Sequence, residues 1–199
     1  MKTLAILLVA VAALLAAVAP ASALDPETVW TKGTWLWSVE TGYGSQFNLE
    51  NKRTISEIEF VVLGARWSLL PLGLTGSGPL RGALEVGLEP IYLHYLEPGD
   101  AYFGGLAAMS RYHFTSLGRF VPYVELGAAA GGTNLEVIEI DSSFAFLLMG
   151  GLGASVLVTD RHALYAGYRW THNSNGNTDT PNRGWEAHTG VVGVTFFLK

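Results

Sequence analysis

The sequence predicts an all-β protein, specifically an eight-stranded antiparallel transmembrane β-barrel of the outer membrane, from three observations. After residue 23, apolar residues alternate with others in runs of strand length, and segments rich in Gly, Pro and polar residues separate the runs. Mean hydropathy is positive, yet no apolar run after residue 23 reaches the roughly 20 residues of a spanning helix. The 24 glycines and the 12% of aromatic residues suit turns and interfacial rings.

The first 23 residues predict a secretory signal peptide. A charged start at Lys2 precedes an apolar stretch over residues 4–19, and Ala21-Ser22-Ala23 has the small residues of a cleavage site. A transmembrane helix is the alternative, but the stretch is short and meets a proline. We therefore expect residues 24–199 to form a single outer-membrane barrel domain.

Composition narrows the chemistry of that domain. The chain has no cysteine, so neither disulfides nor thiolate metal sites are available. The net charge of −5 argues against nucleic-acid binding, for which a basic face is the usual mark. No metal-ligand spacing appears, and no cofactor is predicted.

Eight strands are expected in order along the mature chain. They cover residues 33–43, 55–70, 82–95, 102–114, 120–130, 144–158, 164–172 and 186–198. In the second strand, Glu57 and Glu59 share the parity of apolar residues, which predicts a bulge near residues 60–62. In the third, Pro90 predicts a bend or bulge.

One face of most strands is apolar, while the other carries scattered charges. A soluble barrel of this size would bury the aliphatic face, so the pattern is inverted and indicates a lipid-facing wall. A closed barrel satisfies every backbone donor and acceptor in lipid, and eight strands leave an interior that side chains just fill. The charged residues expected to form an internal ion-pair network are Glu40, Glu85, Glu89, Arg111, Glu125 and Arg169.

The final residues, 191–199, resemble the terminal signal of outer-membrane barrels, a glycine followed by alternating apolar residues; an ordinary edge strand is the alternative. Lys199 departs from the usual aromatic end. Such barrels begin and end in the periplasm. The connections at 44–54, 94–101, 131–143 and 173–184 are then expected on the extracellular side, and those at 115–119 and 159–162 in the periplasm.

Residues 168–188 hold the candidate chemistry. His172 and Ser174 continue the even-numbered apolar face of the seventh strand, and Glu186 has the parity of the eighth. If His172 lies opposite Glu186, the whole hairpin is in a consistent register. A serine, a histidine and a glutamate on one face form a nucleophile, base and orienter set for hydrolysing an ester in the outer leaflet. Asn175 would donate to the oxyanion.

This segment resembles the outer-membrane lipid A 3-O-deacylase (PagL) family through His172-x-Ser174-Asn175, Asn182-x-Gly184 and Glu186. The motif covers about fifteen residues, and elsewhere only the barrel pattern is similar. The resemblance implies a Ser-His-Glu triad of Ser174, His172 and Glu186. It implies that Asn175 and Asn182 line an oxyanion hole, and it places Gly184 in the same substrate-binding loop. The implied substrate is the 3-O-linked acyl chain of lipid A in lipopolysaccharide.

Other interpretations of the same residues stay open. Taken singly, His172 is explained as an aromatic-belt residue, and Ser174 and Asn175 as turn residues. His188 is expected in the girdle below the site. An outer-membrane phospholipase and a non-catalytic structural or adhesion barrel are the alternative functions. The expected partners are lipopolysaccharide and outer-membrane lipids, and the sequence leaves open whether two copies form a homodimer.

Overall fold

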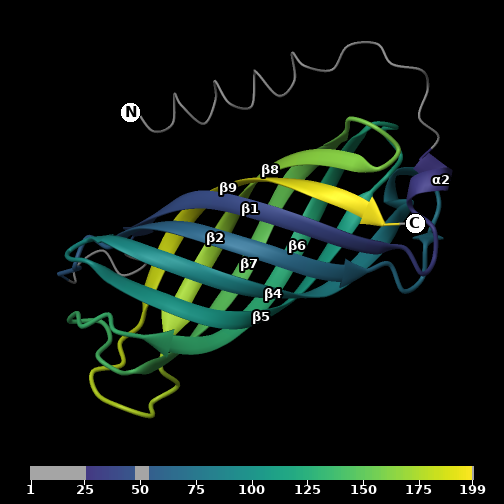
Figure 1. Cartoon of the computed structure of the whole chain (residues 1–199). Coiled ribbons are helices and arrows are strands. Elements are labelled where there is room, and N and C mark those ends of the chain that lie inside the picture. Colours follow the sequence, from purple (N-terminus) through teal and green to yellow (C-terminus); the bar gives the residue numbers. More distant parts are fainter. Residues whose placement is uncertain (1–25, 48–53, 199) are drawn as a thin grey trace, which may run out of the picture.

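The computed structural model describes residues 26–47 and 54–198 as a closed antiparallel barrel (Figure 1). The expected signal peptide and Lys199 lie outside the described residues. Each of eight long strands pairs with its neighbours in the chain, and the pairing of the first with the last closes the barrel. These strands are β1 (Trp35–Phe47), β2 (Glu59–Leu69), β4 (Gly82–Glu97), β5 (Ala101–Phe114), β6 (Phe120–Thr133), β7 (Phe144–Leu157), β8 (His162–Ser174) and β9 (Trp185–Leu198). The predicted fold class is confirmed.

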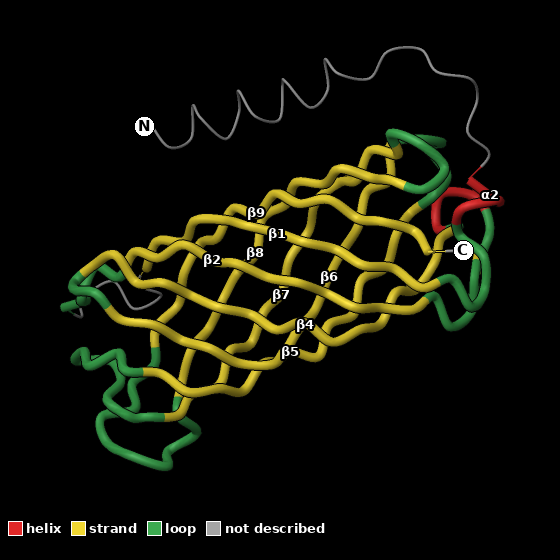
Figure 2. Tube along the Cα trace, viewed as in Figure 1, coloured by secondary structure: helices red, strands yellow, loops and turns green. Residues whose placement is uncertain are grey.

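The two ends of the barrel differ. One end, here called the α2 end, carries the short helix α2 (Pro26–Val29), the two-residue strand β3 (Leu74–Thr75), the turn η1 (Gly78–Leu80) and the last residues of β9. The other, here called the long-loop end, carries the connections after β1, β4, β6 and β8 (Figure 2). Within the described residues, no helix has the length and apolar character needed to cross a membrane.

Side-chain burial alternates along the strands as predicted. Leu88, Leu126 and Leu148 point outward and are exposed, whereas Glu89 and Glu125 on adjoining positions are buried. Because successive residues of a strand face opposite sides of the sheet, the apolar side chains cover the outer wall and the charges fill the interior. This arrangement fits a lipid-facing barrel, in which the outer surface is the apolar one.

The predicted internal ion-pair network is present, and it includes two residues that were not in the predicted set, Arg66 and His113, the second of which lies 2.7 Å from Glu85. Arg169 contacts Glu40 at 2.7 Å and Glu125 at 2.9 Å. Arg66, which the prediction omitted, contacts Glu89 at 2.6 Å. The network crosses the middle of the barrel, and apolar residues fill the interior above and below it.

The apolar filling at the α2 end was not anticipated. Trp30, just after α2, is buried there, with its ring centroid 4.4 Å from that of His113 and 5.1 Å from that of Phe197. The residues before β1 therefore close this end of the barrel from inside. A short segment without periodicity gives no sequence signal for such packing.

The second strand corrects one prediction. It begins at Glu59 rather than at residue 55, and its alternation continues unbroken through residues 60–62. Glu57 has a positive φ of 55° and precedes the strand, so its parity carries no information about the sheet. The pairing between β2 and β4 shifts only between Glu59 and Phe60. An irregularity in the pairing is thus present beside the predicted place, but it does not change which face the β2 side chains occupy, as the predicted bulge would have done. β1, β4 and β6 also extend further toward the long-loop end than expected.

Candidate active site

The β8–β9 hairpin has the predicted register. His172 lies opposite Glu186, Trp170 opposite His188, and Tyr168 opposite Gly190. The alternating burial of both strands places these even-numbered residues on the outer wall. Parity along the two strands fixes the face that these residues share, because a shift of one residue would turn the whole set inward.

A hydrogen bond joins the two ionisable residues of the predicted set. His172 Nδ1 lies 3.0 Å from Glu186 Oε1. An ionised carboxylate only accepts hydrogen bonds, so with Glu186 ionised Nδ1 carries the ring hydrogen and Nε2 is the unprotonated nitrogen. The side chains are 26% and 21% exposed, respectively, so the pair sits at the surface but is partly shielded from solvent. This is the geometry of a general base with its orienting carboxylate.

Ser174 is the last residue of β8, on the same face as His172 and directly opposite Phe146 of β7. Residues two apart along a strand are separated by about 6.6–6.8 Å. Within the described part of the chain, the Ser174 hydroxyl forms no hydrogen bond, including none to His172. The structure thus joins the histidine to the glutamate and places the serine beside them without completing the third contact.

Gly184 closes one edge of the histidine ring. Its φ is +71°, a conformation that favours glycine. A Cβ atom at this position would lie 3.0 Å from His172 Cε1, 3.6 Å from His172 Nε2 and 2.8 Å from the carbonyl oxygen of Asn173. The backbone of the β8–β9 loop therefore lies close to the Cε1 corner of the imidazole. The glycine of the motif is explained by both its conformation and this close approach.

The two asparagines of the motif hold the loop itself. Asn175 is fully buried, and its backbone N–H donates to Asn182 Oδ1 at 2.8 Å. The Asn175 side-chain amide donates to the carbonyl oxygen of Asp179, and its Oδ1 accepts from the N–H of Asn177. Asn182 Nδ2 in turn donates to Asn177 Oδ1 at 2.9 Å. These bonds order the turn that follows Ser174. In this structure the two oxyanion candidates therefore form hydrogen bonds within the loop that stabilise its conformation.

Aromatic residues complete the surroundings. Trp170 stacks alongside His172, with ring centroids 6.0 Å apart and planes inclined by 14°. His188 bonds to the Tyr168 hydroxyl at 2.7 Å and stacks on Phe47 at 4.0 Å. This environment matches the girdle position expected for His188. The contribution of Trp170 was not predicted, although its shared parity with His172 was the available signal.

The comparisons with known proteins decide the family. A family model described as lipid A 3-O-deacylase (PagL) matches residues 27–195. The chain belongs to this family. The match includes β8, the β8–β9 loop and most of β9, and so every residue of the candidate site. The family is one of hydrolases that act on lipid A. The sequence motif around His172 and Glu186 predicted the same family.

Solved structures agree on the fold. The crystal structure of the outer membrane enzyme PagL is 18% identical with a TM-score of 0.58, and the match covers 79% of this chain and 97% of that one. Neisserial surface protein A (NspA) is 16% identical with a TM-score of 0.56, over 84% of this chain and 98% of that one. A comparison with curated proteins gives no match. The family and its structural neighbours place the barrel among outer-membrane proteins.

Proposed function

We propose that this chain is a lipid A 3-O-deacylase that uses Ser174 as nucleophile, His172 as base and Glu186 as orienter. The observation that carries the proposal is the hydrogen bond between His172 and Glu186 on the outer wall of a barrel of this family. A site on the outer wall meets lipids of the surrounding leaflet, rather than solutes that would pass through the interior. An ester at headgroup depth is the bond within its reach.

The reaction would proceed through an acyl-enzyme. Ser174 Oγ attacks the ester carbonyl while its proton passes to His172 Nε2, and Glu186 stabilises the imidazolium that forms. Collapse of the tetrahedral intermediate expels the sugar hydroxyl, which takes the proton back from His172. Water, activated by the same nitrogen, then releases the fatty acid. The proposal requires the Ser174 side chain to turn toward Nε2, a rotation between staggered χ1 wells.

Asn175 and Asn182 remain the proposed oxyanion donors. In the loop described above, each donates an amide hydrogen within the loop. A side-chain amide has two hydrogens, so each asparagine keeps a second one to offer when substrate displaces the local packing. One such donor is worth about 2.7–4 kcal/mol in comparable sites. The loop bonds would then serve to hold these donors in place.

A groove on the outer wall supports an acyl substrate. It has a volume of about 580 Å³ and lies over β5, β6, β7 and β8. Its lining residues are Ala108, Ser110, Leu126, Gly127, Ala128, Leu148, Met149, Gly150 and Trp170. Most of these residues are small or apolar, and a surface of this kind accepts a hydrocarbon chain.

The groove is continuous with the candidate site. Leu148 is the direct cross-strand neighbour of His172, Ala128 of Leu148, and Ala108 of Ala128. These cross-strand neighbours form a row from His172 to Ala108. His172 lies near the long-loop end of β8, whereas Ala108 lies in the middle of β5. Moving away from the histidine along the row therefore leads toward the middle of the barrel. An acyl chain whose ester lies at His172 would run deeper into the hydrocarbon layer.

We infer that the long-loop end faces the outside of the cell. Barrels of this kind have longer loops on the extracellular side. The site would then sit near the interface of the outer leaflet, where a charged residue on the lipid face costs about 0–1 kcal/mol instead of the roughly 2–4 kcal/mol at the midplane. The mutual hydrogen bond of His172 and Glu186 reduces the cost further.

The proposal is tested by mass spectrometry of lipid A from cells that make the wild-type chain or Ser174→Ala at equal levels of folded barrel. Loss of one hydroxyacyl group only with the wild type is the expected result. Unchanged lipid A in both strains would refute the proposal, and a parallel assay on phospholipid, with and without chelator, would then test the phospholipase alternative. Equal loss in both would remove Ser174 from the reaction.

A further inference from the structure

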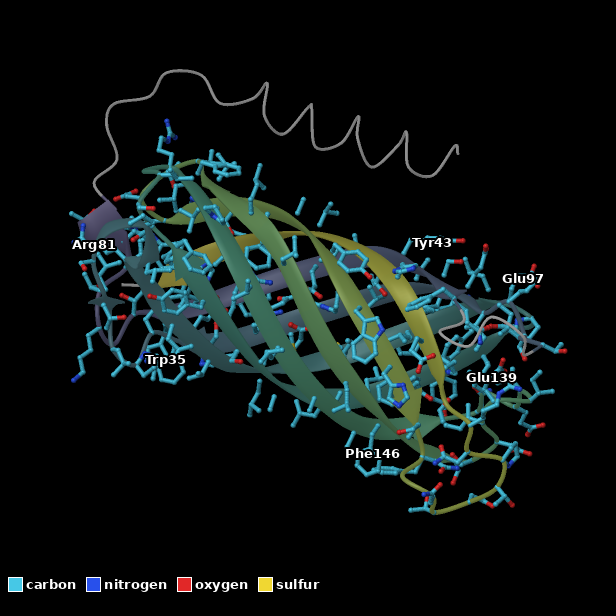
Figure 3. The ribbon with its side chains drawn as sticks, turned by 180° about the vertical axis from the view of Figure 1, so that it is seen from behind. Trp35, Tyr43, Arg81, Glu97, Glu139 and Phe146 are labelled. Atoms are coloured by element: carbon cyan, nitrogen blue, oxygen red, sulfur yellow. The ribbon has the colours of Figure 1, made fainter. Side chains whose placement is uncertain are left out.

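A buried carboxylate lies in the loop between β6 and β7, above the candidate site. Glu139 is 1% exposed, although its loop projects from the long-loop end, where Figure 3 shows it on the same side of the barrel as Phe146. A charge that leaves water needs several hydrogen bonds in compensation. The hydrogen-bond partners of Glu139 therefore show which segments of the chain this residue connects.

The carboxylate joins three loops. Ser56, from the β1–β2 loop, donates its N–H to Oε1 at 3.0 Å and its hydroxyl to Oε2 at 2.7 Å. Gln46, at the end of β1, donates its side-chain amide at 3.0 Å. Arg183, from the β8–β9 loop, donates from Nη2 at 3.0 Å. Segments that are far apart in sequence thus meet at one side chain.

The backbone of Glu139 holds Gly184, which lies beside the histidine. Its carbonyl oxygen accepts the N–H of Arg183 at 2.8 Å and the N–H of Gly184 at 3.0 Å. Gly184 is the residue whose backbone lies close to the Cε1 corner of His172. A pairing between Ile140 and Asn182 continues the contact between the two loops. A short path therefore runs from the Glu139 carboxylate through its own backbone to the imidazole.

The charge state of Glu139 is consistent with this role. Burial acts to raise the pKa of its carboxyl, but hydrogen bonds from Ser56 and Gln46 outweigh burial, so the pKa lies below its ordinary value. The group is therefore ionised at neutral pH and presents only acceptors to the donors around it.

We propose that Glu139 is a positioning residue for the esterase site, acting on His172 through Gly184. The inference rests on the proposed function and adds a residue outside the family motif. The imidazole would then be fixed by Glu186 at Nδ1 and by the Gly184 backbone beside Cε1. Glu139 makes the second constraint rigid by fastening the β8–β9 loop to its neighbours.

The test uses purified, folded barrels of the wild type, Glu139→Ala and Glu139→Gln, with Glu136→Gln as the matched control. Glu136 lies in the same loop but is exposed, and no hydrogen bond of its side chain is found in the described residues. Two substrates are assayed, lipid A in micelles and a soluble short-chain nitrophenyl ester. Heat-modifiable migration on gels verifies the folding of each barrel.

A positioning role predicts that Glu139→Ala lowers kcat on both substrates by the same factor, roughly 10- to 100-fold, because a small misplacement of a catalytic group has effects of this size. KM should stay within about twofold by the same reasoning, since substrate contacts are intact. Glu139→Gln keeps the shape and several acceptor contacts and should recover part of kcat. The control should match the wild type.

A double variant tests the path through Gly184. If Glu139 acts through this residue, the loss in Glu139→Ala combined with Gly184→Ala should be smaller than the product of the two single losses. The proposal would be overturned if the two single losses multiplied in the double variant, or if Glu139→Ala left kcat unchanged or changed KM alone. Loss of the folded barrel in both Glu139 variants would also overturn it. A wild-type barrel inactive on both substrates would instead refute the proposed function.

Discussion

Replacing Glu186 by glutamine isolates the orienting role of this residue with little change in shape. The variant keeps an amide oxygen that can accept from His172 Nδ1, but it removes the negative charge next to the ring. In the proposed reaction, His172 becomes positively charged as it takes the proton of Ser174. The transition state therefore loses a charged hydrogen bond that the native pair provides at 3.0 Å.

The size of the loss follows from the environment of the pair. A hydrogen bond to a charged group contributes about 1.5–3 kcal/mol. Because the two side chains are 26% and 21% exposed, water competes for them and the lower half of that range applies. At about 1.36 kcal/mol per tenfold change in rate, kcat should fall roughly 10- to 50-fold. A glutamine that donated to Nδ1 would impose the wrong tautomer, and the loss would approach about 10⁴-fold.

The assay is the initial rate of acyl release from lipid A, measured by mass spectrometry on folded barrels in detergent. Glu59→Gln is the control, because Glu59 is a carboxylate on the outer wall of β2 that pairs across to Ser45 rather than with β8. If Glu186→Gln stayed within threefold of the wild type while Ser174→Ala was inactive, Glu186 would not orient the base. The hydrogen bond seen here would then be incidental to catalysis.

Four further predictions follow from the same contacts. Gly150→Leu should fill the acyl groove, since a Cβ there is at ordinary contact distance from its neighbour, and should reduce the rate on lipid A but not on a short-chain ester. Gly184→Ala should lower kcat more than tenfold, because the left-handed conformation costs an alanine about 1–2 kcal/mol and its Cβ would meet the His172 ring. Arg169→Met leaves Glu40 and Glu125 less well paired and should lower the free energy of unfolding in urea by about 3 kcal/mol, the low end for a buried pair because both carboxylates keep other partners. The pKa of the Glu139 carboxyl is lowered in the folded protein, so its contribution to loop stability is complete above the ordinary glutamate pKa of about 4.3 and is lost only as the pH falls below that value. Protection of the Ser56 amide against hydrogen exchange should follow the same pH dependence.

Much of the fold could be predicted because strand parity reports directly on the two faces of a barrel wall. Alternation identified the outward leucines and most of the inner charges, and it fixed the register of the last hairpin. It failed at Glu57, whose left-handed backbone precedes the strand and so breaks the link between parity and face. It also gave no information on Trp30, since a short segment that folds into the barrel has no period to detect.

The candidate site divides in the same way. His172 and Glu186 were predictable as a pair because they belong to one hairpin, where register alone determines which side chains are opposed. The contacts of Glu139 with Ser56 and Gln46 were not, because they join one loop to another loop and to the end of β1. Loop residues follow no period, and their meeting depends on how the whole barrel closes.

The difference between the predictable hairpin contacts and the unpredictable loop contacts follows from the position of the site on the outer wall. Two paired strands can present His172 and Glu186 side by side, but a flat outer wall leaves the far edge and one face of the imidazole open to lipid. Trp170 covers the face from the same strand, whereas only a segment that rises above the sheet can cover the edge. The β8–β9 loop does so through Gly184, and that loop needs support from outside its own hairpin. On this reasoning, a lipid-facing esterase site requires a rigid loop scaffold in addition to its hairpin, and the buried carboxylate of Glu139 supplies the fixed point for it.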